Sequence, residues 1–161
     1  MLTDAIMEEC MHYVQSNLHI SYSDLIIDPC ADNKHLINLI RNKMCASLFY
    51  NADISLTSDP NIQPYEFLTV DYDRFDKTVL SGLWYDDVHI IGCPPEAAAA
   101  AFIKKCCEFA DSISFILPQG MEKHFTKEYK LLFSTPLTTK NAKVFQSWMR
   151  MDKGAAAPLN P

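Results

Sequence analysis

The sequence predicts a single α/β domain built on a mostly parallel sheet with helices on both faces. Short apolar runs alternate with helix-forming segments, as expected where helices connect parallel strands. Each run is uninterrupted, which is typical of strands buried on both faces. The last two runs have no helix-length gap between them, so we expect them to pair antiparallel at one edge. With 161 residues, 48% of them hydrophobic, the chain can form one such core.

The first half of the chain is predicted to form two helices and two strands. Apolar residues spaced three and four apart give the first helix one buried face, and Thr3 or Asp4 can cap it. The first strand must end at Asp28-Pro29, because proline cannot continue a central strand. In order, we expect a helix over Thr3–Asn17, a strand over Leu25–Ile27, a helix around Leu36–Ile40 and a strand over Ala46–Tyr50 that ends at Asn51–Asp53.

The second half is predicted to hold the remaining strands and a strong helix that contains a run of alanines. In order, we expect a loop over Ser55–Pro64, a short strand within Glu66–Tyr72, a strand over Val88–Ile91, a helix over Ala97–Phe109, a strand over Ser112–Leu117 and the paired strands Tyr129–Phe133 and Val144–Trp148. We assign residues 1–150 to the domain and residues 151–161, which contain alanine and proline, to an extended or disordered tail.

Composition limits the classes of function. The net charge of -6, from 14 Lys and Arg against 20 Asp and Glu, gives no general attraction to nucleic acid. No apolar run approaches the length of a membrane span, and the N-terminus lacks a signal-peptide pattern. We therefore expect an intracellular protein, cytoplasmic or nuclear, that does not contact membranes. Its six cysteines are expected to be reduced, and none has the spacing of a zinc site, so we predict no metal.

Acidic and amide residues follow the first predicted strands. Asp28, Asp32, Asn51 and Asp53 all lie where a strand ends. Ligands of open α/β sheets bind beyond the carboxyl ends of the strands. Such residues suit a neutral or cationic ligand with hydroxyls and amines, but surface turns also favour Asp and Asn. Both interpretations stay open on composition alone.

Four segments resemble, in chain order, the motifs of one family. Ser23–Lys34 carries Asp-Pro followed by Ala-Asp-Asn-Lys, and His89–Glu96 ends in Cys-Pro-Pro-Glu. Phe102–Pro118 and Val144–Trp148 follow. Together they resemble the S-adenosylmethionine-dependent adenine-N6 methyltransferases with an Asn-Pro-Pro-aromatic tetrad, in the versions found in large DNA viruses and some microbes. The resemblance runs from Ser21 to Arg150 and implies a Rossmann-like methyltransferase fold.

The resemblance also implies a cofactor site, with departures from the family. Asp32 and Lys34 stand at two glycine positions, where a side chain is expected to crowd the cofactor. Asn51 aligns with the acidic residue that holds the ribose hydroxyls, and Asp53 is the nearest substitute. We therefore expect no bound cofactor; if the chain is active, S-adenosylmethionine would lie against the family positions Asp28, Ala31, Asp32, Asn51 and Asp53.

The tetrad departs further from the family's Asn-Pro-Pro-aromatic pattern than the cofactor site does. Cys93, Pro94, Pro95 and Glu96 occupy its four positions. The first residue of the tetrad accepts hydrogen bonds from the target amine, and a thiol is a weak acceptor. The fourth gives an aromatic face on which the flipped base stacks, worth roughly 1–3 kcal/mol, and Glu96 has none. The prolines can keep their backbone role without chemistry.

These departures lead to three hypotheses. In the first, the chain is a degenerate, catalytically inactive methyltransferase-like domain that binds another protein chain, such as an assembly module of a large DNA virus, in the host cell or the virion. In the second, it is an active adenine-N6 methyltransferase acting on DNA or RNA. In the third, it is a pseudoenzyme that binds nucleic acid through Lys123, Lys127 and Lys130. A solvated surface is the commoner explanation of such lysines.

Two further features of the sequence each have a functional and a structural interpretation. Cys93 could act as a nucleophile with His89 as its base, but four strand residues separate the two side chains by roughly 13 Å, too far for a hydrogen bond. Trp84 and Tyr85 could lie exposed in a loop and contact a protein partner, since aromatic residues dominate interface hot spots. Burial of both rings against the sheet is the alternative.

Overall fold

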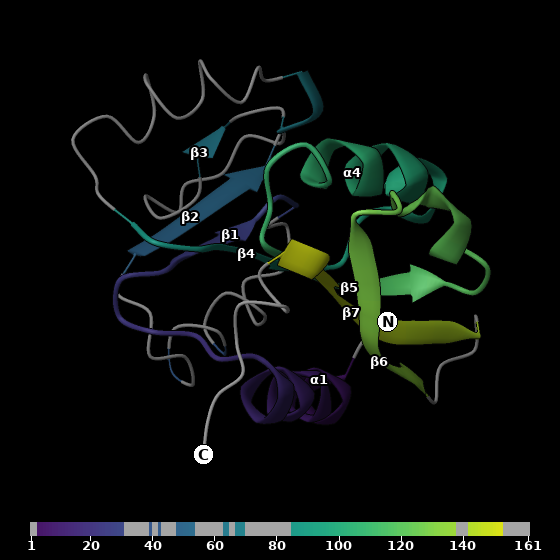
Figure 1. Ribbon diagram of the computed structural model, residues 1–161. Coiled ribbons are helices and arrows are strands. Elements are labelled where there is room, and N and C mark those ends of the chain that lie inside the picture. The colour runs from purple at the N-terminus through teal and green to yellow at the C-terminus, as the bar shows by residue number, and fades with distance from the viewer. Residues whose placement is uncertain are drawn as a thin grey trace.

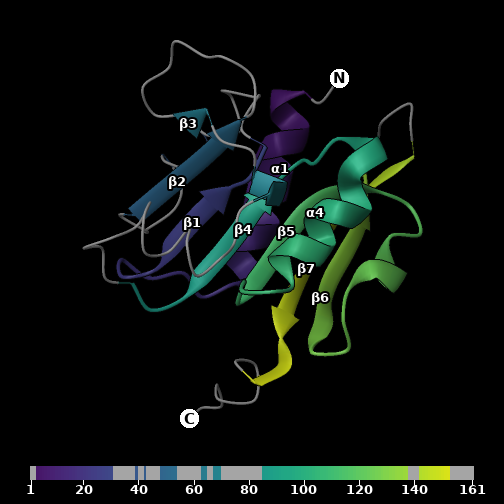
Figure 2. The ribbon, with the colours of Figure 1, turned by 90° about the horizontal axis from the view of Figure 1, so that it is seen from above.

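The computed structural model describes residues 3–30, 39, 42, 48–53, 63–64, 67–69, 85–137 and 142–152. The expected helix around Leu36–Ile40 lies outside these residues except for Leu39, and the tail after Asp152 lies wholly outside them. Within the part described, the chain forms one sheet with a helix on each face (Figures 1 and 2).

The sheet has seven strands in the order β3-β2-β1-β4-β5-β7-β6. The first five pair in parallel, and β7 runs antiparallel to both of its neighbours. The strands are β1 Leu25–Asp28, β2 Leu48–Asp53, β3 Gln63–Pro64, β4 Val88–Gly92, β5 Ser112–Pro118, β6 Tyr129–Pro136 and β7 Lys143–Arg150. The predicted fold class, a mostly parallel sheet with an antiparallel C-terminal pair, is confirmed.

Helix α1, Asp4–Asn17, begins as its sequence predicts. The Thr3 hydroxyl accepts a hydrogen bond from the Ile6 amide at 3.3 Å and so satisfies an otherwise unpaired donor of the first turn. One face of the helix is buried, through Met7, Cys10, Met11 and Val14. Among the described residues, no helix combines the length and apolar character needed to cross a membrane.

The sheet separates two apolar clusters, because successive side chains of a strand point to opposite faces. On the α1 face, Ile26, Ile91 and Ile116 pack with the buried residues of α1 to form what we call the α1-face cluster. On the other face, α4 covers the second cluster, which we call the α4-face cluster. Its members from the strands include Leu25, Ile27, Val88, Ile90, Ile113, Phe115 and Leu117.

The structure corrects three element predictions. Gln63–Pro64 forms the short strand β3 inside the predicted loop, and its edge position tolerates a proline. Phe67–Thr69 is a 3₁₀-helix rather than a strand, and its Phe67 ring stacks on Phe102 of α4 with centroids 6.1 Å apart. The predicted helix Ala97–Phe109 is shorter than expected: α4 spans Ala99–Cys106, after a 3₁₀ turn over Glu96–Ala98.

Candidate functional site

The carboxyl ends of the parallel strands bring several of the predicted site residues to one edge of the sheet. Asp28, the last residue of β1, is in register with Asn51 of β2, and Asp53 is in register with Pro64 of β3. The β4 strand, paired with β1, ends at Gly92, so that Cys93 follows at the same edge. Ala31 and Asp32 lie outside the described residues.

Asp28 is buried against β4. Its side chain is only 1% exposed, and its Oδ1 accepts a hydrogen bond from the Cys30 amide at 3.2 Å. A Cβ added at Gly92 would lie 2.9 Å from the same oxygen and 3.3 Å from Pro29 Cδ. Glycine at position 92 thus lets the Asp28 carboxylate pack tightly on the end of β4. The carboxylate is therefore enclosed between the ends of β1 and β4.

Gly92→Ala tests this close contact. We expect the substitution to lower the free energy of unfolding by about 1–3 kcal/mol, because the new methyl group overpacks the Asp28 carboxylate. Urea denaturation followed by tryptophan fluorescence measures the change. Combining it with Asp28→Ala should cost less than the sum of the two single substitutions, since the clashing oxygen is then gone. Additive costs would show that the two residues do not interact.

The four tetrad positions connect the end of β4 to the turn that precedes α4. Cys93 is half-buried and packs against the α1-face cluster. Pro94 is buried, whereas Pro95 and Glu96 are exposed, and Glu96 opens the 3₁₀ turn that leads into α4. The Glu96 side chain has no aromatic face, and the Cys93 thiol has no carbonyl oxygen to accept from an amine.

His89 lies on β4 at the opposite, amino end of the sheet and is engaged through both ring nitrogens. Its Nδ1 lies 2.7 Å from the Ser112 hydroxyl of β5, and its Nε2 lies 2.9 Å from Asp24 Oδ2. All three residues are buried. The network ties together the beginnings of β1, β4 and β5. The imidazole is therefore directed away from Cys93 and provides it with no base.

Asp24 is held as a carboxylate by this network. Burial raises the pKa of Asp24, but hydrogen bonds from His89 and from the amides of Ser21 and Asp87 outweigh that effect and lower it below the ordinary value. The amide of Ser21 donates to Oδ2 at 3.0 Å, and the amide of Asp87 donates to Oδ1 at 3.3 Å. The residue therefore closes the turn before β1 as well as pairing with His89.

The lowered pKa of Asp24 predicts an acid-dependent contribution to stability. The ionised carboxylate stabilises the fold above the unfolded pKa of about 3.9, and this contribution is lost as the pH falls through the lower native pKa. We expect Asp24→Asn to cost about 1–3 kcal/mol at neutral pH and progressively less below about pH 4. Urea denaturation of both proteins across this pH range measures the difference in their free energies of unfolding. A difference that does not shrink at low pH would contradict the stabilisation of Asp24 as a carboxylate.

The three lysines of the nucleic-acid hypothesis are exposed, but acidic residues accompany them. Lys123 lies in a 3₁₀ turn, Lys127 in the following turn and Lys130 in β6. The same short segment carries Glu122 and Glu128, also exposed. The local charge is therefore mixed.

The two aromatic residues considered for protein contact differ in how far they are described. Tyr85 is half-buried and packs against the α4-face cluster. Burial, rather than exposure in a loop, is thus the observed state of this ring. Trp84 lies outside the described residues.

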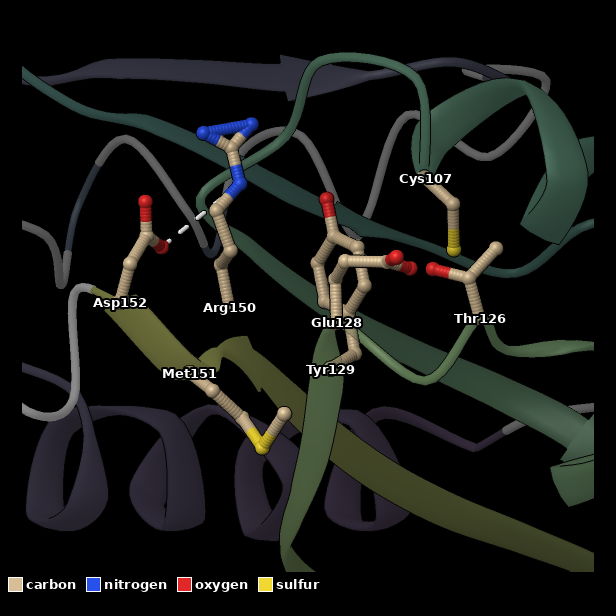
Figure 3. Close-up of a pocket in the computed structure, with 7 residues that line it drawn as sticks. All are labelled: Cys107, Thr126, Glu128, Tyr129, Arg150, Met151 and Asp152. Atoms are coloured by element: carbon tan, nitrogen blue, oxygen red, sulfur yellow. Dashed lines mark ion pairs between the residues drawn. The ribbon is translucent and has the colours of Figure 1, made fainter.

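A hollow of about 530 Å³ lies at the amino end of the sheet, away from the predicted site (Figure 3). The end of β7 reaches this edge because Met149 is in register with Ser112, the first residue of β5. Arg150 is paired there with Asp111 at 3.5 Å and with Asp152 at 3.9 Å. Burial by itself lowers the pKa of Arg150, but Tyr129 and these two carboxylates raise it by more than burial lowers it. The net effect is a raised pKa, so the guanidinium stays charged. The lining residues are Cys107, Thr126, Glu128, Tyr129, Arg150, Met151 and Asp152.

Solved methyltransferase structures are similar to the chain over most of its length. The rRNA methyltransferase AviRa from Streptomyces viridochromogenes aligns with a TM-score of 0.62 at 10% identity, over 98% of this chain and 88% of AviRa. The 23S rRNA methyltransferase ErmE aligns with a TM-score of 0.55 at 13% identity, over 100% of this chain and 71% of ErmE. The fold is that of the Rossmann-like S-adenosylmethionine-dependent methyltransferases.

The similarity to this methyltransferase fold is one of structure and not of sequence. TrmN from Thermus thermophilus aligns with a TM-score of 0.56 at 8% identity, over 92% of this chain, and the chain spans about half the length of TrmN, 49%. No protein-family model matches the sequence, and no curated protein is similar to it. The comparisons therefore define the fold and leave the reaction and the target to be inferred from the site.

Proposed function

We propose that this chain is a degenerate adenine-N6 methyltransferase-like domain that binds another protein chain and does not transfer methyl groups. The observation that carries the proposal is the state of the tetrad positions. Glu96 is exposed where the family has a stacking ring, and Cys93 packs against the α1-face cluster where the family has an amine-accepting oxygen.

Loss of either the hydrogen-bond acceptor or the stacking ring would reduce the stabilisation of the transition state. A preorganised acceptor contributes roughly 3–4 kcal/mol to a reaction of this kind, and base stacking contributes about 1–3 kcal/mol. Glu96 adds a negative charge beside the path of a polyanionic target. Together, these effects predict a rate several orders of magnitude below that of an intact site.

The edge that would hold the cofactor supports the same proposal. The Asp28 carboxylate is buried, its Oδ1 accepts a hydrogen bond from the Cys30 amide, and it packs closely against Gly92. In sequence, Asp32 and Lys34 replace glycines of the first motif, and Asn51 replaces an acidic residue. A cofactor would have to compete with the Asp28 contacts and fit beside two larger side chains.

Isothermal titration with S-adenosylmethionine, and with its demethylated product, tests the cofactor part of the proposal. We expect no binding heat at protein concentrations of tens of micromolar. Micromolar binding would overturn the pseudoenzyme assignment and favour the active adenine-N6 methyltransferase, with Cys93 to Glu96 lining its target pocket. A methyl-transfer assay on adenine-containing DNA and RNA then separates cofactor binding from catalysis.

Restoring the tetrad gives a second test. The variant Cys93→Asn/Glu96→Tyr supplies both missing groups, and the variant Cys107→Asn/Glu108→Tyr introduces the same residues at the far end of α4 as a matched control. If the cofactor edge is closed, neither variant methylates. Activity gained only by the tetrad variant would show that the cofactor site is intact and that the tetrad alone is degenerate.

The partner part of the proposal is tested separately. A protein-binding module is expected to co-purify with a defined chain from its own cells or virions, whereas a nucleic-acid-binding pseudoenzyme is expected to be retained on DNA or RNA in a salt-dependent way. Substituting Lys123, Lys127 and Lys130 by Gln should abolish such retention if those lysines bind phosphate. Retention on nucleic acid with no protein partner would overturn the assembly role.

A further inference from the structure

The amino end of the sheet gathers three metal-binding side chains from separate parts of the chain. Asp24 precedes β1, whereas Asp87 and His89 lie at the start of β4. One ligand atom from each lies within 4.8 Å of the other two. Asp24 and His89 are buried, and Asp87 is half-buried, so the cluster is protected from water on one side and accessible on the other. This site lies at the opposite end of the sheet from the tetrad and is independent of the proposed function.

The geometry of the His89 ring suits a metal ligand. Its Nδ1 is fixed by the Ser112 hydroxyl at 2.7 Å, which directs Nε2 toward Asp24. Histidine ligands of metals are usually oriented by a hydrogen bond at the other ring nitrogen. Nε2 and Asp24 Oδ2 lie 2.9 Å apart, at hydrogen-bond distance, whereas two ligands about 2.1 Å from a tetrahedral ion lie about 3.4 Å apart. A shift of about 0.5 Å would therefore let an ion take the place of the shared proton.

The charges around the cluster also favour a cation. Asp24 and Asp87 place two carboxylates within 4.8 Å of each other, at which distance like charges repel. Asp86, which accepts from the Ser23 hydroxyl at 2.6 Å, adds a third carboxylate to the same turn. A divalent ion would neutralise the repulsion and bridge β1 to β4.

We propose that Asp24, Asp87 and His89 form a site for a divalent transition-metal ion of the zinc type. One imidazole and two carboxylates supply three ligands, and water completes the coordination. The imidazole favours zinc and its neighbours over magnesium and calcium, which prefer oxygen ligands alone. The ion would clamp the beginnings of two central strands, and the Ser112 hydroxyl would orient its histidine ligand.

Metal titration of the full chain tests the proposal. After treatment with a chelator and its removal, zinc chloride should bind with one-to-one stoichiometry and raise the melting temperature, whereas magnesium chloride should do neither at the same concentration. The variant Asp87→Asn should weaken zinc binding at least tenfold. Because Asp87 is half-buried, this variant is the one best suited to keep the fold. Ser112→Ala, which removes the orienting hydroxyl, should weaken binding about 10- to 100-fold.

Two controls make the result decisive. Asp86→Asn removes a neighbouring carboxylate that is not a ligand and should leave the zinc affinity within about threefold of the wild type. Thiols can also bind zinc, and five free cysteines lie in the described part of the chain. Zinc binding that persists undiminished in Asp87→Asn would assign the ion to thiols and overturn the proposal. So would the absence of any zinc-dependent shift in the melting temperature.

Discussion

His89→Leu should lower the free energy of unfolding by about 3 kcal/mol. The substitution removes an imidazole that is 3% exposed and leaves the Asp24 carboxylate and the Ser112 hydroxyl buried without their shared partner. Leaving a buried polar group without its hydrogen-bond partner costs about 1–3 kcal/mol, and the substitution leaves two such groups. The total stays well below the sum of the upper limits because the amides of Ser21 and Asp87 still donate to Asp24. Urea denaturation in the presence of a chelator measures the effect without bound metal.

The matched control for His89→Leu is His19→Gln, which changes an exposed histidine outside the network and should alter stability by less than about 0.5 kcal/mol. The double variant Asp24→Asn/His89→Leu should cost less than the sum of its parts, because each single substitution already disrupts the hydrogen bond that the two side chains share. A His89→Leu variant as stable as the wild type would show that the network contributes nothing to the fold.

The strands that could be predicted from sequence are those whose burial is complete. Leu25–Ile27, Val88–Ile91 and Ser112–Leu117 are buried on both faces because helices cover both sides of the sheet. Their mostly apolar sequences show this without tertiary information. Proline and glycine then set their ends. The cap of α1 is equally local: the sequence predicts Thr3 or Asp4, and the structure has Thr3.

Elements fixed by tertiary contacts could not be predicted in this way. The two residues of β3 form a strand because they pair with the edge of β2. Two residues are too few to show the alternation of apolar and polar side chains that would predict a strand. Phe67 lies in a 3₁₀-helix because its ring packs on Phe102 and Phe109, although the sequence around it predicts a strand. α4 ends early since Phe109 and Ala110 must turn into the core before β5 begins.

The functional-site residues also divide into those that sequence order places together and those that only tertiary contacts bring together. Asp28, Asn51 and Cys93 meet at one edge because carboxyl ends of parallel strands must, so sequence order was sufficient. The contacts of His89 with Asp24 and Ser112 join residues 65 and 23 positions apart, and they depend on strand register that no local pattern reveals. One signal was present: a polar residue within an apolar strand requires a buried partner.

Phe115→Ala should be the most destabilising single substitution in the central sheet, at about 3–5 kcal/mol. Phe115 is fully buried in β5, in register with Gly92, and its ring would lie 3.6 Å from a Cβ at that position. Removing the ring leaves a cavity in the α4-face cluster beneath the end of β4, where Asp28 and Cys30 are held. The melting temperature should fall by about 10 °C, since 1 kcal/mol corresponds to about 2–4 °C for a chain of this size.

The matched control is Leu131→Ala on the edge strand β6, where the side chain is 42% exposed, so the loss should stay below about 1 kcal/mol. Phe115→Ala should lower the free energy of unfolding more than Gly92→Ala does. A cavity in the centre of the sheet cannot relax, whereas a carboxylate at the carboxyl ends of the strands can. The reverse order would mean that the contact between Asp28 and Gly92, and not the apolar cluster, holds β1 and β4 together.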